Sequence, residues 1–140
     1  MKISKIIHFF LLTPYFIIVS ITAYSNSHNN YLEEVYAHLR NKQFPEAINK
    51  LKYHSEKNKS EAQLLYAKIL YSGEITTQNF EMSYFWANTS KLGGLKKSSN
   101  IIRNLNDLID EENKLKINEK IKIFLNKSAL SGDKLAIVQI

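Results

Sequence analysis

The chain has 140 residues, of which 44% are hydrophobic and none is cysteine, and its net charge is +6. The absence of cysteine excludes a disulfide framework, a thiol nucleophile and a thiolate metal site, while the apolar content is sufficient for one folded core. The basic residues are mostly lysines spread along the chain, which is poor material for bidentate phosphate recognition, so we expect no nucleic-acid partner.

The first 25 residues have the pattern of an export signal. Two lysines precede an apolar run over residues 6–21, and Ala23 and Ser25 place small side chains at the expected cleavage positions. We predict a signal peptide over residues 1–25, cleaved after Ser25 or, alternatively, after Ala23. The run is about 16 residues long and contains a proline, whereas a spanning helix needs about 20 residues. An uncleaved anchor in the inner membrane is the remaining alternative.

The part that follows the signal, residues 26–140, carries the apolar periodicity of helices and no strand pattern of any length. We expect six helices with short loops between them, hence an all-α domain. Their expected ranges are about 31–41, from 44 into the polar run 54–60, 61–72, from near 80 to 92, about 101–109, and from the acidic cluster 110–112 to about 128.

Residues typical of helix ends separate the central helices. Ser60 is expected to cap the start of the third helix, and Gly73 is expected to end it. Thr76 or Thr77 is the expected cap of the fourth helix, and the glycine pair 93–94 marks a break after it.

The chain ends in the apolar stretch LAIVQI within the tail 129–140. No second strand is available for pairing with it. We expect the tail to pack along the last helix as a short extended segment, with a fragment of a further helix as the alternative.

The stretch 62–94 carries small residues, glycines and one tryptophan at characteristic spacings: Ala62, Ala67, Leu70, Gly73, Ser83, Trp86, Ser90 and Gly94. These positions resemble, without a gap, a Sel-one-like repeat, which is a relative of the tetratricopeptide repeat. Small residues allow two helices to approach closely, a tryptophan fills the wedge between hairpins, and glycines turn the chain. Two positions depart from the family pattern: Ile75 stands where a second glycine is usual, and Asn79 where aspartate is usual. A register shifted by one residue at Phe85 and Trp86 is the alternative.

The resemblance implies a short α/α superhelix, or solenoid, of about three helical hairpins. Residues 30–58 would form a divergent first repeat, and residues 62–94 the best preserved one. Residues 98–128 would form a degenerate capping repeat, in which Arg103 occupies a position that the family keeps small.

The sequence offers no catalytic group, and we predict neither enzymatic activity nor a cofactor or metal. His38 and His54 lie on different helices without a carboxylate at ligand spacing. The acidic cluster 110–112 is what the dipole favours at a helix start.

One group of residues lies away from the apolar stripe of the third helix: Leu64, Lys68 and Tyr71. In arrays of the family that the chain resembles, first helices line a concave surface that binds other proteins. These three residues are therefore candidates for a partner contact, and packing against adjacent helices is the alternative.

We expect a bacterial protein exported to the periplasm or the medium that acts as a protein-protein interaction or scaffolding module. The alternatives are an accessory or regulatory factor of a cell-envelope enzyme, or a membrane-anchored structural protein. Membrane contact is expected only through the N-terminal segment, if it is uncleaved.

Overall fold

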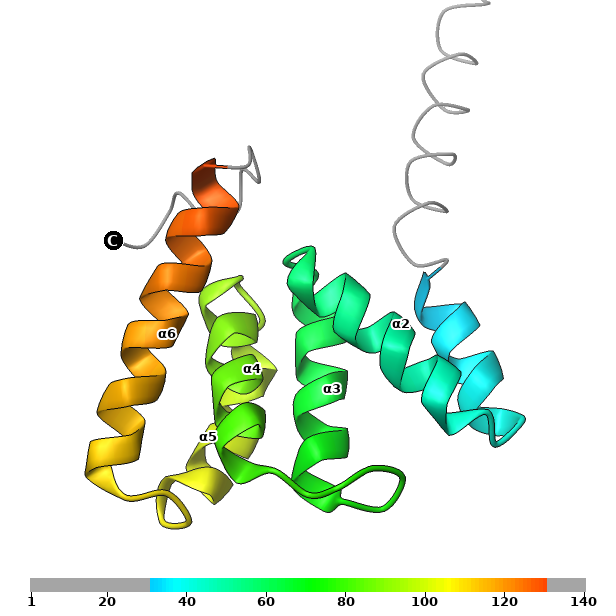
Figure 1. The fold of residues 1–140 in the computed structure, drawn as a ribbon, viewed down its shortest axis with the longest axis horizontal. Helices are drawn as coiled ribbons and strands as arrows, with labels where there is room; N and C mark the ends of the chain where they lie inside the picture. Colours follow the sequence, from blue (N-terminus) through cyan, green and yellow to red (C-terminus); the bar gives the residue numbers. More distant parts are fainter. Residues whose placement is uncertain (1–30, 131–140) are drawn as a thin grey trace, which may run out of the picture. The chain divides into compact units, whose positions relative to one another are not determined.

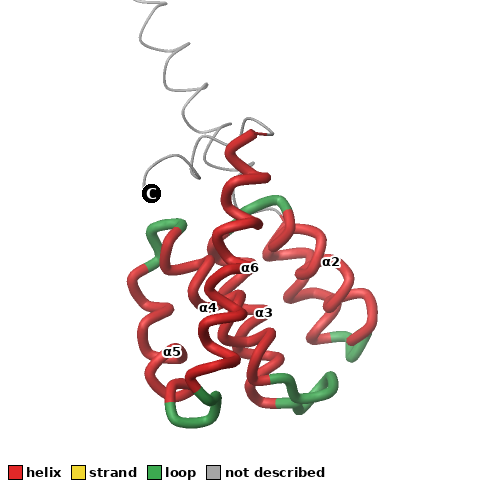
Figure 2. Tube along the Cα trace, turned by 60° about the vertical axis from the view of Figure 1, so that its left-hand side comes forward, coloured by secondary structure: helices red, strands yellow, loops and turns green. Residues whose placement is uncertain are grey.

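A computed structural model describes residues 31–130, and every regular element in that range is a helix (Figures 1 and 2). The all-α prediction is confirmed for this part of the chain. The predicted signal peptide, the cleavage position and residues 131–140 lie outside the described residues. Residues 31–40 are helical, and the elements that follow are α2 (Phe44–Glu56), α3 (Ser60–Ser72), α4 (Phe80–Leu92), the 3₁₀ turn η1 (Lys96–Ser98), α5 (Ser99–Asn106) and α6 (Glu111–Leu130).

The helix α4 is the centre of the packing. It contacts α3, α5 and α6, whereas α5 and α6 make little direct contact with each other. The helix α3 lies between α2 and α4 (Figure 1). Because it is covered on two sides, α3 has buried residues around much of its circumference.

Aromatic packing around Trp86 joins three of the helices. Trp86 is 4% exposed, and its ring centroid lies 4.8 Å from that of Phe85, 6.0 Å from Tyr66 of α3 and 5.6 Å from Phe124 of α6. Burial of rings of this size supplies a large share of a small domain's stabilisation. Trp86 is therefore a core residue, as the sequence predicts.

Small residues and hydrogen bonds from serine side chains to backbone carbonyls hold α3 against α4. Ser83 Oγ donates a hydrogen bond to the Ala67 carbonyl at 2.7 Å, and Ser90 Oγ donates to the Ser60 carbonyl at 2.7 Å. Ser60 Oγ donates to the Gly93 carbonyl at 3.0 Å, and a Cβ at Gly93 would collide with that hydroxyl. The small side chains at these positions thus allow a side chain of one helix to reach the backbone of its neighbour.

The predicted cap of α3 is wrong. The helix begins at Ser60 itself, and the preceding residue, Lys59, makes no side-chain capping bond. The Ser60 hydroxyl instead donates a hydrogen bond to the Gly93 carbonyl across the helix pair. The predicted end is confirmed, since Gly73 follows α3 with a left-handed φ of 70°.

The predicted cap of α4 is also wrong, because neither Thr76 nor Thr77 precedes the helix directly. Asn79 is the cap, and its side chain accepts a hydrogen bond from the backbone N–H of Met82 at 2.9 Å. The backbone N–H of Asn79 is bonded to the carbonyl of Leu70, which ties the loop back to α3 and delays the start of α4.

Not every apolar residue of α6 faces the core. Leu115 is 67% exposed, whereas Ile121 is buried. The helical period places Ile117, Ile121 and Ser128 toward the core instead. The helix α5 also ends at Asn106, earlier than the expected range.

The start of α6 gives a prediction on pH dependence. The Asp110 carboxylate accepts hydrogen bonds from the backbone N–H and the side-chain amide of Asn113, both at 2.8 Å. The backbone hydrogen bond holds the pKa of Asp110 below its ordinary value. A lowered pKa stabilises the fold above the ordinary carboxyl pKa, and this contribution disappears as pH falls through the lowered value.

We therefore expect Asp110→Ala to lower the urea midpoint at pH 7. The difference in midpoint between this variant and the wild type should shrink as the pH falls from the ordinary carboxyl pKa through the lowered pKa of Asp110. Asp110→Asn is the matched control, because asparagine caps a helix without titrating. It should retain most of the midpoint at pH 7. An equal loss for Asp110→Ala at neutral and at strongly acidic pH would refute the charge contribution.

Candidate functional site

The three residues predicted to contact a partner do not form one exposed surface. Leu64 is 4% exposed and belongs to the core cluster, while Lys68 is exposed. Tyr71 is half-buried, with its ring centroid 5.9 Å from that of Phe80. Leu64 is thus buried in the core, because α3 is covered by α2 and α4.

His38 and His54 lie on different helices in the described part of the chain. His38 Nδ1 lies 2.9 Å from Gln43 Oε1, and His54 is on α2. Between residues 31 and 130 no three His, Asp or Glu side chains are grouped as metal ligands would be.

A groove lies along α6, beside the last turns of α4. It has a volume of about 640 Å³. This size falls within the range of about 300–1,000 Å³ that is usual for ligand-binding clefts. Its lining residues are Asn88, Lys91 and Leu92 of α4 and Leu115, Lys116, Asn118, Glu119, Ile121, Lys122 and Leu125 of α6.

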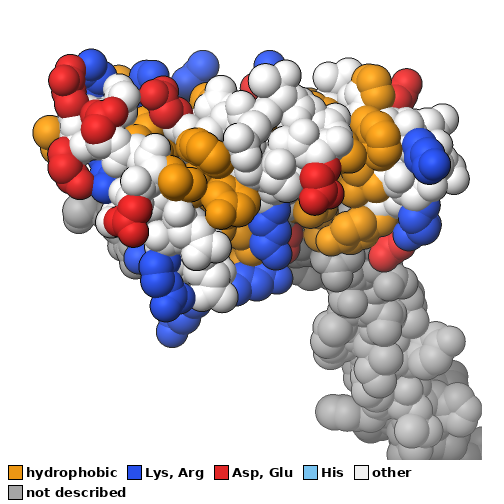
Figure 3. Space-filling model, turned by 90° about the horizontal axis from the view of Figure 1, so that it is seen from below, with side chains coloured by type: hydrophobic (Ala, Val, Ile, Leu, Met, Phe, Trp, Pro, Cys, Tyr) orange, Lys and Arg blue, Asp and Glu red, His pale blue; other side chains and the backbone are white. Residues whose placement is uncertain are grey.

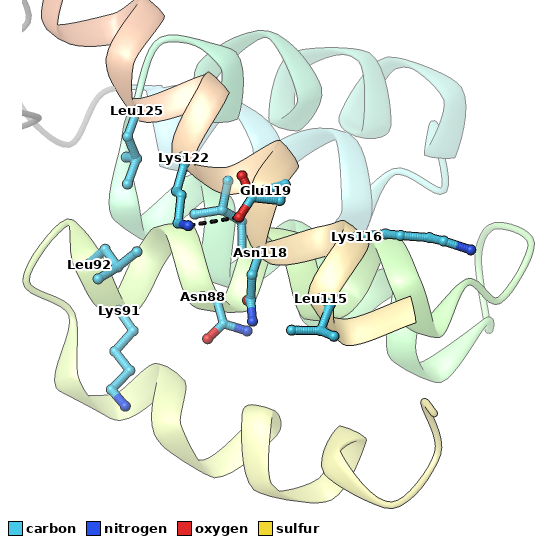
Figure 4. Close-up of a pocket in the computed structure, with 10 residues that line it drawn as sticks. Asn88, Lys91, Leu92, Leu115, Lys116, Asn118, Glu119, Lys122 and Leu125 are labelled. Atoms are coloured by element: carbon cyan, nitrogen blue, oxygen red, sulfur yellow. Dashed lines mark hydrogen bonds and ion pairs between the residues drawn. The ribbon is translucent and has the colours of Figure 1, made fainter. Parts of the chain in front are cut away.

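Leucines lie at the ends of the groove and amides in its middle (Figure 4). Leu115 lies at one end and is 67% exposed; Leu92, which is 36% exposed, lies at the other end. Asn88 and Asn118 point into the space between these ends (Figure 4). Asn88 Nδ2 donates to the Tyr84 carbonyl at 2.8 Å, which fixes the orientation of this amide.

The rim of the groove carries more positive than negative charge. Lys122 forms an ion pair with Glu119 at 2.7 Å. Lys116 pairs with Glu112 at 2.6 Å and points away from the groove (Figure 4). Lys91 forms no ion pair with any residue that the structure describes, so it is the cation available to a negatively charged group in the groove.

A smaller depression of about 390 Å³ lies between the start of α4 and the connection from α5 to α6. Its acidic residues are Glu81 and Asp110, and Asp110 already serves as the cap of α6. The loops at this end are seen from below in Figure 3, where hydrophobic side chains lie among charged side chains of both signs. This depression is smaller than the groove, and fewer apolar side chains line it.

Sequence reasoning missed the groove because its leucines come from helices distant in sequence. The available signal was the position of Leu115 in the helical period, two residues before Ile117 and six before Ile121, which places it on the opposite side of the helix from both inward-facing residues. Leu92, at the last position of α4, carried no comparable signal.

No protein-family model matches the chain, and neither a curated protein nor a solved structure shows significant similarity to it. Among residues 31–130, no helix has both the length and the apolar character required to cross a membrane.

Proposed function

We propose that this chain is an exported, non-catalytic protein-binding module and that the α4–α6 groove receives its partner. The observation that carries the proposal is the exposure of Leu92 and Leu115 at the two ends of one groove, beside the unpaired Lys91. Exposed leucines in a hollow supply apolar binding area, and a nearby charge orients the ligand.

The composition of the groove suits a short peptide segment better than a small polar metabolite. Leucine-sized side chains of a partner fit the two ends, and the amides of Asn88 and Asn118 can both donate to and accept from a peptide backbone between them. A partner carboxylate near Lys91 would complete the complementarity.

We also propose that the helices form a short α/α superhelix of the Sel-one-like type. Support comes from the complete burial of Ala62, Ala67 and Ser83 and from the left-handed backbone of Gly73. The limited contact between α5 and α6 fits a degenerate last repeat. The proposed site of action, the periplasm or the medium of a bacterium, rests on the N-terminal sequence pattern.

Affinity capture from an envelope extract of the source organism tests the groove. Leu115→Glu places a charge inside it, whereas Leu108→Glu is the matched control, since Leu108 is a 50% exposed leucine outside the groove. We expect the wild type and Leu108→Glu to retain the same protein, and Leu115→Glu to lose it by about tenfold or more, the usual effect at a binding hot spot. Equal capture by both variants, with equal thermal stability, would contradict the proposal.

A further inference from the structure

A second surface of α6 faces away from the core and carries a row of lysines and aliphatic residues. Its members recur at steps of four, three, four and three residues, so they share one helix face. All of them are exposed, with Ile123 at 67% and Leu130 at 90% exposure. We call this row the α6 outer stripe: Lys116, Lys120, Ile123, Lys127 and Leu130.

The fold does not use the aliphatic residues of the α6 outer stripe. The residues of α6 that enter the core, among them Ile117 and Ile121, lie on the other side of the helix. Exposed aliphatic residues at 67% and 90% cost solubility without adding to the core. A contact outside this domain would explain why they are present.

The charge of α6 defines the kind of contact. The helix contains five lysines and three glutamates, and Glu112 and Glu119 are each paired with a lysine of the same helix. Lys120 and Lys127 form no ion pair with a described residue. The α6 outer stripe therefore presents available positive charge on both sides of Ile123.

We infer that the α6 outer stripe docks on an anionic phospholipid surface. Ile123 and Leu130 would enter the boundary between headgroups and acyl chains, while the lysines reach lipid phosphates with their aliphatic stems lying along the apolar boundary. A planar surface suits this stripe because its five exposed residues lie on one helix face over about 21 Å, at 1.5 Å per residue, with Ile123 and Leu130 about 10 Å apart. The stripe shares only Lys116 with the lining of the groove, and the inference goes beyond the proposed protein-binding function.

A site-specific fluorescent probe on the full chain tests the inference. The chain has no cysteine, so a single substitution gives a single labelling site. Asn126→Cys places an NBD fluorophore beside the stripe, and Lys52→Cys, an exposed position on α2, is the control. The probe on α6 responds to local insertion whether or not residues 6–21 also attach the chain to the vesicle.

With phosphatidylglycerol vesicles we expect a blue shift of the probe at residue 126 but not at residue 52, and no shift with phosphatidylcholine vesicles. Adding Lys120→Gln and Lys127→Gln together should raise the lipid concentration at half-maximal shift by about 30-fold. Adding Ile123→Asp should abolish the shift.

Four results would overturn the inference. Three of them are no shift at residue 126, the same shift at residue 52, and an equal shift with phosphatidylcholine. The fourth is a shift at residue 126 when an acidic protein of the envelope extract is added without lipid, which would assign the stripe to a protein partner. None of these outcomes bears on the capture of a partner by the α4–α6 groove.

Discussion

Trp86→Ala is expected to lower the free energy of unfolding by about 3–5 kcal/mol, the usual cost of removing a buried aromatic ring. The indole is 4% exposed and contacts rings of α3, α4 and α6, so its loss leaves a cavity where three helices meet. Small domains have a total stability of about 5–15 kcal/mol, so the variant would be close to unfolding. Urea denaturation followed by circular dichroism measures the effect. Tryptophan fluorescence cannot be used, because Trp86 is the only tryptophan and the variant lacks it.

Trp86→Phe is the control for ring packing. The indole N–H is buried without a hydrogen-bond partner, so phenylalanine removes an unsatisfied donor while it keeps a ring against Phe124. We expect less than half the loss seen for alanine. If the two variants were equally destabilised, the ring contacts would not be the source of the stability.

Leu105→Ala is expected to cost about 2–5 kcal/mol. Leu105 is fully buried in the core cluster and belongs to α5, a helix of only 8 residues. A helix this short has little stability of its own, so its attachment to α4 depends on such contacts. Thermal unfolding should therefore show a large fall in midpoint.

The matched control for Leu105→Ala is Leu115→Ala. The same side chain is removed, but Leu115 is 67% exposed, and surface substitutions usually change stability by no more than about 0.5 kcal/mol. A loss at Leu115 as large as that at Leu105 would mean that the α4–α6 groove is closed by packing and is not open to a partner.

The helices themselves were predictable from the sequence. Apolar periodicity placed the start of α2 at Phe44 and the end of α3 at Gly73, where the backbone is left-handed as glycine permits. The local sequence was also sufficient to predict that α6 begins at the acidic cluster 110–112.

The helix caps could not be predicted from local preference alone. Serine is a good capping residue, but Ser60 bonds to Gly93, which is 33 positions away in the sequence. Asn79 caps α4 because the loop before it is bonded back to Leu70. In both cases a residue at the helix start takes part in a tertiary hydrogen bond that local preference does not reveal.

The candidate surfaces depend on tertiary packing in the same way. Leu64 seemed available when α3 was considered by itself, yet α2 and α4 enclose that helix and the side chain is buried. Leu115 lies on the same helix as the buried Ile117 and Ile121 but is 67% exposed, and packing against α4 decides which side of α6 faces the core.

Photo-crosslinking from inside the groove tests the proposed protein-binding function most directly. A benzoylphenylalanine at Asn118, which points into the groove in Figure 4, is compared with one at Lys52 on α2. We predict one discrete adduct from residue 118 in the envelope of the source organism and none from residue 52, with the adduct lost when Leu92→Glu is added. Adducts of equal yield from both positions, or none from residue 118, would contradict the assignment of the groove as a partner-binding site.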